Sequence, residues 1–197
     1  ISDLKNSGKE IILVSSGSIA VGVHALDLRE KPADTPTRQA AAAVGQSDLM
    51  MLYDRMFSEY GNKAAQVLLT LDVIEDAERK ANVVNTFCAL LKMGAVPIVN
   101  ENDTVSVEEL VLGGDNGKLS FGDNDFLSAI VAKLVGADAL VILTDIDALY
   151  DDDPRANPYA KRIAAVEQIT PELLGIAGGT GSGRGTGGMR TKLDAAK

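Results

Sequence analysis

Two short polar runs have the residue types of a site that binds a charged small molecule. Residues 15–18 (SSGS) follow an apolar run and open an expected helix, where free backbone N–H groups and the helix dipole favour an anion. Residues 100–103 (NEND) hold two amides and two carboxylates, which suit an ammonium group or other polar substrate atoms. Helix caps and solvated turns use the same residue types, so each run alone leaves both interpretations open.

Two further polar runs stand at expected element boundaries. Asp123 and Asp125 flank Asn124 at the start of an expected helix, and N-capping explains one of the three more easily than all of them. Thr144 and Asp145 follow the apolar run ALVIL and could equally form an ordinary turn. Neither run is specific by itself.

A glycine-rich run at residues 178–188 is the fifth candidate. Residues 183–188 match the G-x-G-x-x-G spacing of dinucleotide folds, but a helix is expected at 171–177, where that fingerprint requires a strand. Lys192 is not directly preceded by glycine, so the phosphate-loop pattern of nucleotide-binding proteins also fails. We interpret the run as a loop of backbone donors that leads into a helix carrying Thr191 and Lys192, which suits a polyphosphate.

Other chemistry-bearing residues fit structural roles. His24 is expected at the surface of a helix, and Cys88, the only cysteine, is expected in the core. The acidic run 151–153 before a proline is typical of a solvated turn rather than a metal site. A stripe of apolar residues fits helix packing or a subunit interface: Leu49, Leu52, Met56 and Phe57.

The elements that must position these residues alternate between strands and helices. Short apolar runs predict strands at 10–14, 64–69, 96–99 and 139–143. Helical periodicity predicts helices at 19–26, 37–60 with a break at Gly45, 80–93 and 123–135. This alternation predicts an α/β fold, a three-layer αβα sandwich with a mostly parallel central sheet. Ligands bind at the carboxyl ends of such strands, where three of the polar runs stand.

Composition excludes several functional classes. The chain has 197 residues, 46% of them hydrophobic, which favours a single domain over residues 1–197. The net charge of −9 argues against nucleic acid and against an anionic membrane surface as partners. No membrane-spanning run and no signal peptide are expected, so we predict a cytoplasmic protein. The chain begins at Ile1 and stops inside an expected helix, so both ends are expected to be cut.

Six motifs in this order resemble the amino acid kinase family and, within it, the glutamate 5-kinases. They are VSSGSIAVG (14–22), AAVGQ (42–46), IVNENDTV (98–105), FGDNDFLSA (121–129), TDIDALYDDDPR (144–155) and GTGGMRTKLDAAK (185–197). The resemblance implies transfer of the γ-phosphate of ATP, with Mg²⁺, to the side-chain carboxylate of L-glutamate. The product would be glutamyl 5-phosphate, in the first step of proline biosynthesis.

The same resemblance assigns roles to individual residues. Ser16, Asp103 and Asn124 would contact glutamate, and Asp125 would organise the catalytic lysines, of which Lys192 is one. The residues expected around ATP are Thr144, Asp145, Thr186, Gly187, Gly188, Met189, Arg190, Thr191 and Lys192. No metal-ligating residue is assigned. A homo-oligomer, dimer or tetramer, and proline as a feedback inhibitor are also implied.

Some features depart from the family pattern. A second phosphate-binding lysine, in an N-terminal Lys-x-Gly turn, and the C-terminal end of the kinase domain are absent from this sequence. Residues 113–120 form a longer link than expected, within a stretch expected to form a hairpin or flap, and Ala148 stands where glycine is expected. These departures concern the substrate loop and the first lysine rather than the class of reaction.

Several alternative functions stay open at this point. One is the kinase half of a bifunctional pyrroline-5-carboxylate synthase, and acetylglutamate kinase and aspartokinase are further rivals. Another is a non-catalytic module that senses an amino acid or a nucleotide, which the absent lysine segment favours. A nicotinamide-dependent oxidoreductase rests only on the glycine spacing.

Overall fold

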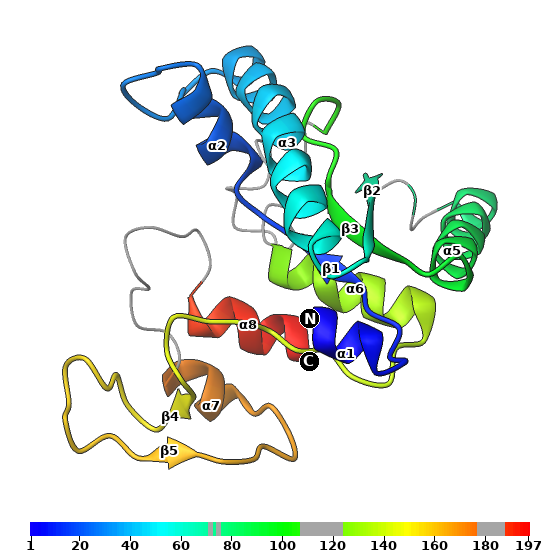
Figure 1. Cartoon of the computed structure of the whole chain (residues 1–197). Coiled ribbons are helices and arrows are strands. Elements are labelled where there is room, and N and C mark those ends of the chain that lie inside the picture. The colour runs from blue at the N-terminus through cyan, green and yellow to red at the C-terminus, as the bar shows by residue number, and fades with distance from the viewer. Residues whose placement is uncertain (71–72, 74–75, 107–123, 177–187) are drawn as a thin grey trace. The chain divides into compact units, whose positions relative to one another are not determined.

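The computed structural model describes residues 1–70, 73, 76–106, 124–176 and 188–197. The chain divides into two compact units, Ile1–Asn124 (unit 1) and Asp125–Lys197 (unit 2), and each is described by itself (Figure 1). Unit 1 contains α1 (Ser2–Asn6), β1 (Leu13–Val14), α2 (Ser18–Ala25), α3 (Thr35–Ser58), β2 (Lys63–Leu69), α5 (Ala77–Lys92) and β3 (Ala95–Glu101). Unit 2 contains α6 (Asn124–Val135, from its second residue), β4 (Leu149–Tyr150), β5 (Arg162–Ile163), α7 (Pro171–Ile176) and α8 (Met189–Ala196).

A parallel three-stranded sheet in the order β1-β3-β2 forms the centre of unit 1. β2 pairs with β3 along its whole length, from Lys63 opposite Ala95 to Leu69 opposite Glu101. Every residue of β3 is buried, as expected for the central strand of a parallel sheet covered on both faces. The expected strands 64–69 and 96–99 are confirmed, and β3 extends two residues beyond the expected end.

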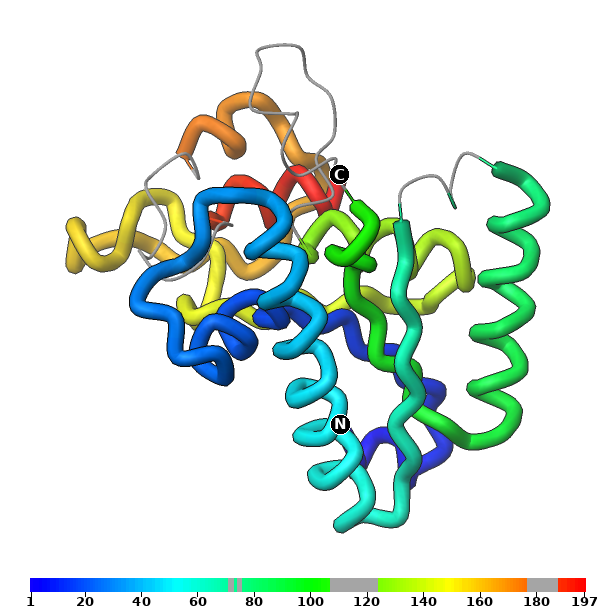
Figure 2. Tube along the Cα trace, turned by 90° about the horizontal axis from the view of Figure 1, so that it is seen from above, coloured from blue at the N-terminus to red at the C-terminus, as the bar shows by residue number. Residues whose placement is uncertain are grey.

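Two helices cover opposite faces of this sheet. The connection from β1 to β2 through α3 crosses the sheet in one direction, and the connection from β2 to β3 through α5 returns in the other. Because parallel crossovers are right-handed, the two connecting helices must lie on opposite faces. Figure 2 shows α3 and α5 on opposite sides of β2 and β3. Unit 1 therefore has the three layers that the sequence predicts.

β1 is much shorter than the expected strand at 10–14. Only Leu13 and Val14 pair with β3, opposite Ile98 and Val99. The Val99 carbonyl accepts a hydrogen bond from the Ser15 N–H at 2.8 Å, so the backbone of Pro97, two residues earlier, also faces β1. Proline has no N–H to donate, which leaves the preceding part of the β1 segment without a ladder partner.

α3 runs without interruption, so the expected break at Gly45 is wrong. Gly45 lies where α3 crosses α2, and an added Cβ would stand 1.8 Å from the Ser18 carbonyl oxygen. Across the same contact, a Cβ on Gly22 would stand 1.8 Å from the Ala41 carbonyl oxygen. The two glycines therefore allow the backbones to touch, and Gly45 serves close helix packing rather than a turn.

Acidic caps determine where the long helices begin. The Asp34 side chain accepts the Thr37 N–H at 2.9 Å before α3, and Asp76 accepts the Arg79 N–H at 2.8 Å before α5. Hydrogen bonds from the Thr37 side chain and backbone lower the pKa of Asp34 below its ordinary value of 3.8.

The core of unit 1 lies between α3 and the sheet. Phe57 near the end of α3 packs there on Val96 and Ile98 of β3.

One apolar prediction in unit 1 is wrong, and a second is confirmed only in part. Cys88 is exposed, because α5 buries Phe87 against the sheet and turns the next residue about 100° away. The expected apolar stripe on α3 divides: Leu49 and Phe57 are buried, whereas Leu52 and Met56 are 52% and 54% exposed. His24 is exposed, as expected.

Unit 2 contains helices and one short hairpin among its described residues. β4 and β5 pair antiparallel, with Leu149 opposite Ile163 and Tyr150 opposite Arg162. The helix expected at 123–135 is confirmed as α6 from Asn124, and it buries Leu127 and Val131. The helix expected at 171–177 is confirmed as α7 over Pro171–Ile176.

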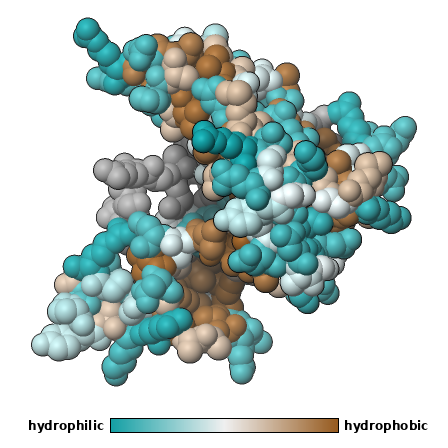
Figure 3. Space-filling model, in the orientation of Figure 1, coloured by the Kyte–Doolittle hydropathy of each residue, from teal (hydrophilic) through white to brown (hydrophobic). Residues whose placement is uncertain are grey.

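The most strand-like run of the sequence, 139–143, forms no strand, so that prediction is wrong. Val141 and Leu143 are 77% and 79% exposed, and the run has no ladder partner among the described residues. A strand needs a hydrogen-bonded neighbour as well as apolar side chains, and only the first requirement is missing here. In the space-filling view, apolar surface (brown) and strongly hydrophilic surface (teal) both lie on the visible face of unit 2 (Figure 3).

Candidate active site

The turn between β1 and α2 buries two of its serines and exposes the third. The N–H and hydroxyl of Ser15 bond to the Val99 carbonyl and to the Tyr53 hydroxyl, each at 2.8 Å. Gly17 adopts a φ of +99°, a left-handed conformation that glycine takes without strain, and α2 begins at the next residue. Ser16 stands exposed at the tip of this turn, at the carboxyl end of the parallel sheet.

Only the second half of the run 100–103 follows the strand. Asn100 and Glu101 belong to β3 and are 3% and 6% exposed, so the expectation of a wholly polar turn after the strand is wrong for them. Asn100 Nδ2 donates to Gln46 Oε1 of α3 at 3.0 Å, and Glu101 Oε1 accepts the Ser106 hydroxyl. These two side chains therefore hold the strand end in place.

Backbone hydrogen bonds hold the turn that carries Asp103. The Asn102 N–H donates to the Leu69 carbonyl at 2.8 Å, and the Ser106 N–H donates to the Asn102 carbonyl at 3.0 Å. The Ser18 hydroxyl of α2 then reaches across and donates to Asp103 Oδ2 at 2.9 Å. Residues from two of the predicted polar runs therefore meet within unit 1.

A pocket of unit 1 opens beside Asp103. Its lining is formed by Ile19, Thr35, Arg38, Gln39, Glu101, Asp103 and Ser106. The lining combines one guanidinium with two carboxylates, charges that complement the carboxylate and ammonium groups of an amino acid. Arg38 was missed in the sequence, because it lies in the first turns of α3 and no motif surrounds it; only the crossing of α3 over the strand ends brings it to Asp103.

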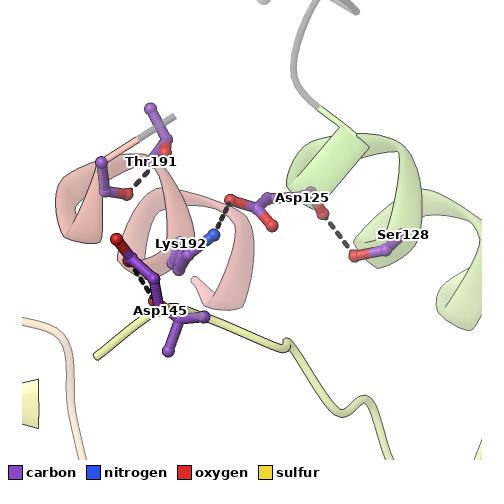
Figure 4. Close-up of polar contacts among 7 residues, drawn as sticks. Asp125, Ser128, Asp145, Thr191 and Lys192 are labelled. Atoms are coloured by element: carbon purple, nitrogen blue, oxygen red, sulfur yellow. Dashed lines mark hydrogen bonds and ion pairs between the residues drawn. The ribbon is translucent and has the colours of Figure 1, made fainter. Parts of the chain in front are cut away.

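In unit 2, Lys192 and Asp125 form an ion pair. Lys192 Nζ of α8 lies 2.8 Å from Asp125 Oδ2 in the first turn of α6, and the two side chains are 18% and 16% exposed (Figure 4). The Ser128 hydroxyl donates to the Asp125 carbonyl at 2.6 Å. Such a partly buried pair is stronger than a surface pair, since it is less screened by solvent.

The start of α8 is the described end of the glycine-rich run. The Thr191 hydroxyl donates to the Gly188 carbonyl at 2.7 Å, which closes the first turn of the helix. Met189 lies in the same turn, and Arg190 makes an exposed ion pair with Asp194 at 3.8 Å. The remaining expected ATP residues of the loop, Thr186 and Gly187, lie outside the described residues. Asp123, the long link at 113–120 and the expected hairpin or flap beyond its first residue, Ser106, also lie outside them.

Thr144 and Asp145 lie exposed after α6. Thr144 Oγ1 is 3.5 Å from Asp145 Oδ1, and Asp145 pairs with Arg155 at 2.9 Å. Asn124, the third expected glutamate contact, is the first residue of α6 and is half-buried. None of these positions contradicts the expected roles, which stay predictions.

The acidic run at 151–153 is an exposed turn, as expected. The Asp151 carboxylate accepts the Lys161 N–H at 2.6 Å, and Asp153 accepts the Arg155 N–H at 2.9 Å. Hydrogen bonds from the Asn157 side chain and from the Asp153 N–H lower the pKa of Asp152 below its ordinary value of 3.8. Within the described part of the chain, no group of three His, Cys, Asp or Glu residues could hold a metal ion. No helix in that part is long and apolar enough to cross a membrane.

Comparison with known proteins shows the family to which this chain belongs. The sequence profile of the amino acid kinase family matches residues 1–197. The chain is 56% identical to a glutamate 5-kinase of Clostridium perfringens over 197 residues, covering all of this chain and 71% of that protein. It is 54% identical to one of Listeria welshimeri, covering 69% of it, and 53% identical to one of Enterococcus faecalis, covering 71%. This chain belongs to the amino acid kinase family.

Proposed function

We propose that this protein transfers the γ-phosphate of ATP to the side-chain carboxylate of L-glutamate, the first step of proline biosynthesis. The observation that carries the proposal is identity of 53–56% to glutamate 5-kinases over the full length of the chain. The geometry adds support, because a zwitterion-compatible pocket in unit 1 and a lysine held by a carboxylate in unit 2 suit this substrate and this reaction. The named relatives give no support to a sensing module or an oxidoreductase.

Glutamate would bind in unit 1. We assign Ser16 and Asp103 to the substrate, together with Asn124 at the start of α6. Asp103 lines the charged pocket and suits the ammonium group, and Ser16 is an exposed serine two residues before α2 begins. The pocket also places Arg38 where it could receive the α-carboxylate, with a planar fork that matches carboxylate geometry.

Lys192 would neutralise charge on the phosphate as it moves. Asp125 holds the Nζ at 2.8 Å and so would set its position before ATP binds. Gly188 to Lys192, with Thr186 and Gly187 before them, would close over the nucleotide, and Thr144 and Asp145 would line its pocket. The substrate carboxylate brings its own nucleophilic oxygen, so positioning and charge stabilisation suffice without a general base.

ATP and Mg²⁺ are the cofactors we propose. Mg²⁺ in kinases is bound through one or two carboxylates together with substrate phosphates, so a preformed protein cage is not required. When bound with ATP, Mg²⁺ would neutralise negative charge on the phosphate oxygens. Asp125, already held by Lys192, is a carboxylate in unit 2 that fits such a shared role.

We also propose that residues 1–197 act as one kinase domain of a cytoplasmic homo-oligomer that proline inhibits. Support for self-association comes from α3, which presents exposed apolar side chains at helical spacing, namely Val44, Met51, Leu52 and Met56. Sedimentation analysis of Leu52→Asp should show a smaller mass than the parent protein. A proline titration of the activity would test the inhibition.

A trapping assay tests the reaction. The full-length protein carrying this sequence would be incubated with Mg-ATP and hydroxylamine, and with glutamate, aspartate or N-acetylglutamate in separate tubes. Hydroxylamine converts an acyl phosphate into a coloured hydroxamate, so the assay reports the bond formed as well as ATP use. We expect colour with glutamate alone. Colour with another acceptor would mean that the enzyme acts on that acceptor instead of glutamate. No colour with any acceptor, from protein that is folded and binds ATP, would overturn the proposal.

A further inference from the structure

Ser18 makes a partly buried, long-range contact to the residue we assign to the substrate's ammonium group. Its hydroxyl donates to Asp103 Oδ2 at 2.9 Å, across 85 positions of sequence. Ser18 itself is only 4% exposed, so it has little surface to offer a substrate. We propose that Ser18 is a positioning residue for glutamate, which acts by holding the Asp103 carboxylate in its binding orientation. This inference rests on the proposed function of Asp103.

The backbone of Ser18 is fixed by close helix packing. Its carbonyl oxygen is the atom that a Cβ on Gly45 would meet at 1.8 Å, and the Gly22 N would be 2.4 Å from the same Cβ. α2 therefore rests directly on the backbone of α3, with no side chain between them. Packed backbones deform little, so the Ser18 hydroxyl is presented from a rigid support.

The backbone of Asp103 is fixed as well, and the Ser18 hydroxyl acts on its side chain. The turn is anchored by the Asn102 N–H on the Leu69 carbonyl at 2.8 Å and closed by the Ser106 N–H. Asp103 lines the pocket, and a hydrogen bond from a buried hydroxyl to an ionised carboxylate restrains the rotation of that carboxylate. Ser18 thus connects a rigid helix contact to the orientation of one substrate-binding group.

A residue that only stabilises the fold would behave differently from a positioning residue. Loss of a structural hydrogen bond would lower the free energy of unfolding and leave the kinetic constants of the folded enzyme unchanged. Loss of a positioning bond would weaken glutamate binding, would spare ATP, and would depend on the presence of Asp103. The two roles are therefore separable by kinetics.

The test compares Ser18→Ala with Tyr53→Phe in the full-length protein that carries this sequence. Alanine is well tolerated in a first helical turn, so the variant should fold, and we expect its KM for glutamate to rise about tenfold with kcat and the KM for ATP nearly unchanged. Tyr53→Phe removes the hydroxyl that bonds Ser15 at 2.8 Å in the same turn, but does not touch Asp103. This matched control should leave the KM for glutamate at the parent value.

A double-mutant cycle with Asp103→Ala decides whether the effect passes through Asp103. We expect Asp103→Ala to raise the KM for glutamate, and Ser18→Ala to add no further increase in that background. An equal increase from Ser18→Ala in both backgrounds, or an equal increase from Tyr53→Phe, would overturn the positioning role while the kinase function stands. An unchanged KM in Asp103→Ala would overturn both the assigned role of Asp103 and this inference, and the trapping assay would still report the reaction.

Discussion

In unit 1 several buried polar side chains near the pocket form hydrogen bonds to distant parts of the unit, whereas in unit 2 most carboxylates face solvent. Asn100 and Ser18, both under 5% exposed, each hold a partner from another element. Asp145 is 59% exposed, and its pair with Arg155 is a surface contact. Lys192 with Asp125 is the exception in unit 2, since both side chains are largely buried.

This contrast has a physical reason. Breaking one of the buried hydrogen bonds of unit 1 would leave a buried polar group unpaired, which costs about 1–3 kcal/mol, so these bonds favour one geometry. Exposed carboxylates in unit 2 can bond to water instead, so their bonds fix little. The unit that would select the amino acid is preorganised by packing, whereas the described part of unit 2 has one partly buried ion pair, Lys192 with Asp125, to fix a charged side chain.

Removal of the unit 2 ion pair should have the largest effect. We expect Lys192→Ala to lower kcat about a hundred- to a thousandfold, the usual cost of losing one charge-stabilising donor, with little change in the KM for glutamate. Lys197→Ala, an exposed lysine at the end of the same helix, is the control and should retain the parent kcat. Steady-state kinetics measures both, and an unchanged kcat in Lys192→Ala would remove the lysine from the mechanism.

Disruption of the close contact between α2 and α3 in unit 1 should have the next largest effect, on the free energy of unfolding. Gly45→Ala would force a Cβ against the backbone of α2, so we expect a loss of ~3 kcal/mol in the free energy of unfolding. Gly175→Ala is the matched control in unit 2, because its Cβ meets no atom of the described residues within 4 Å, and it should be neutral or slightly stabilising. Urea denaturation compares them, and equal stability of the two variants would contradict the contrast between the units.

A smaller loss of stability is expected when the buried hydrogen bond between Asn100 and Gln46 in unit 1 is broken. Gln46→Leu would leave Asn100 Nδ2 buried without its acceptor, so we expect a loss of ~2 kcal/mol in unfolding free energy. Adding Asn100→Leu should recover part of that loss, because both polar groups are then gone. This account would be contradicted if the double variant lost more unfolding free energy than the two single variants lose together. Gln46 Nε2 has no hydrogen-bond partner among the described residues, so Gln46→Leu breaks only the bond to Asn100 in that part of the chain.

The smallest effect is expected in the exposed turn of unit 2. The folded pKa of Asp152 is lowered, so its contribution to stability is present above the unfolded value of 3.8 and is lost as pH falls through the folded pKa. Asn157→Ala removes its largest cause and should move the pKa of Asp152 up towards 3.8, with kcat unchanged. Carboxyl chemical shifts followed by NMR would show this, and an unmoved titration would mean that the Asn157 bond is not formed in solution.

Local patterns in the sequence determined most of the helices, two strands of the parallel sheet and the layered fold, because periodicity and capping act within a few residues. They also located Asp103, Asp125 and Lys192 as residues able to do chemistry. Only the family resemblance assigned these residues to one reaction, because the residue types alone fit helix capping as well as ligand binding.

Tertiary structure alone decided which side chains meet. Whether Gly45 breaks a helix or receives another backbone depends on what crosses it, and only α2 settles that. The run 139–143 has the composition of a strand, but a strand also needs a neighbour at hydrogen-bonding distance, which no local pattern supplies. The bond of Ser18 to Asp103 and the place of Arg38 in the pocket are contacts between distant segments, so they follow from how the chain packs rather than from any single stretch of it.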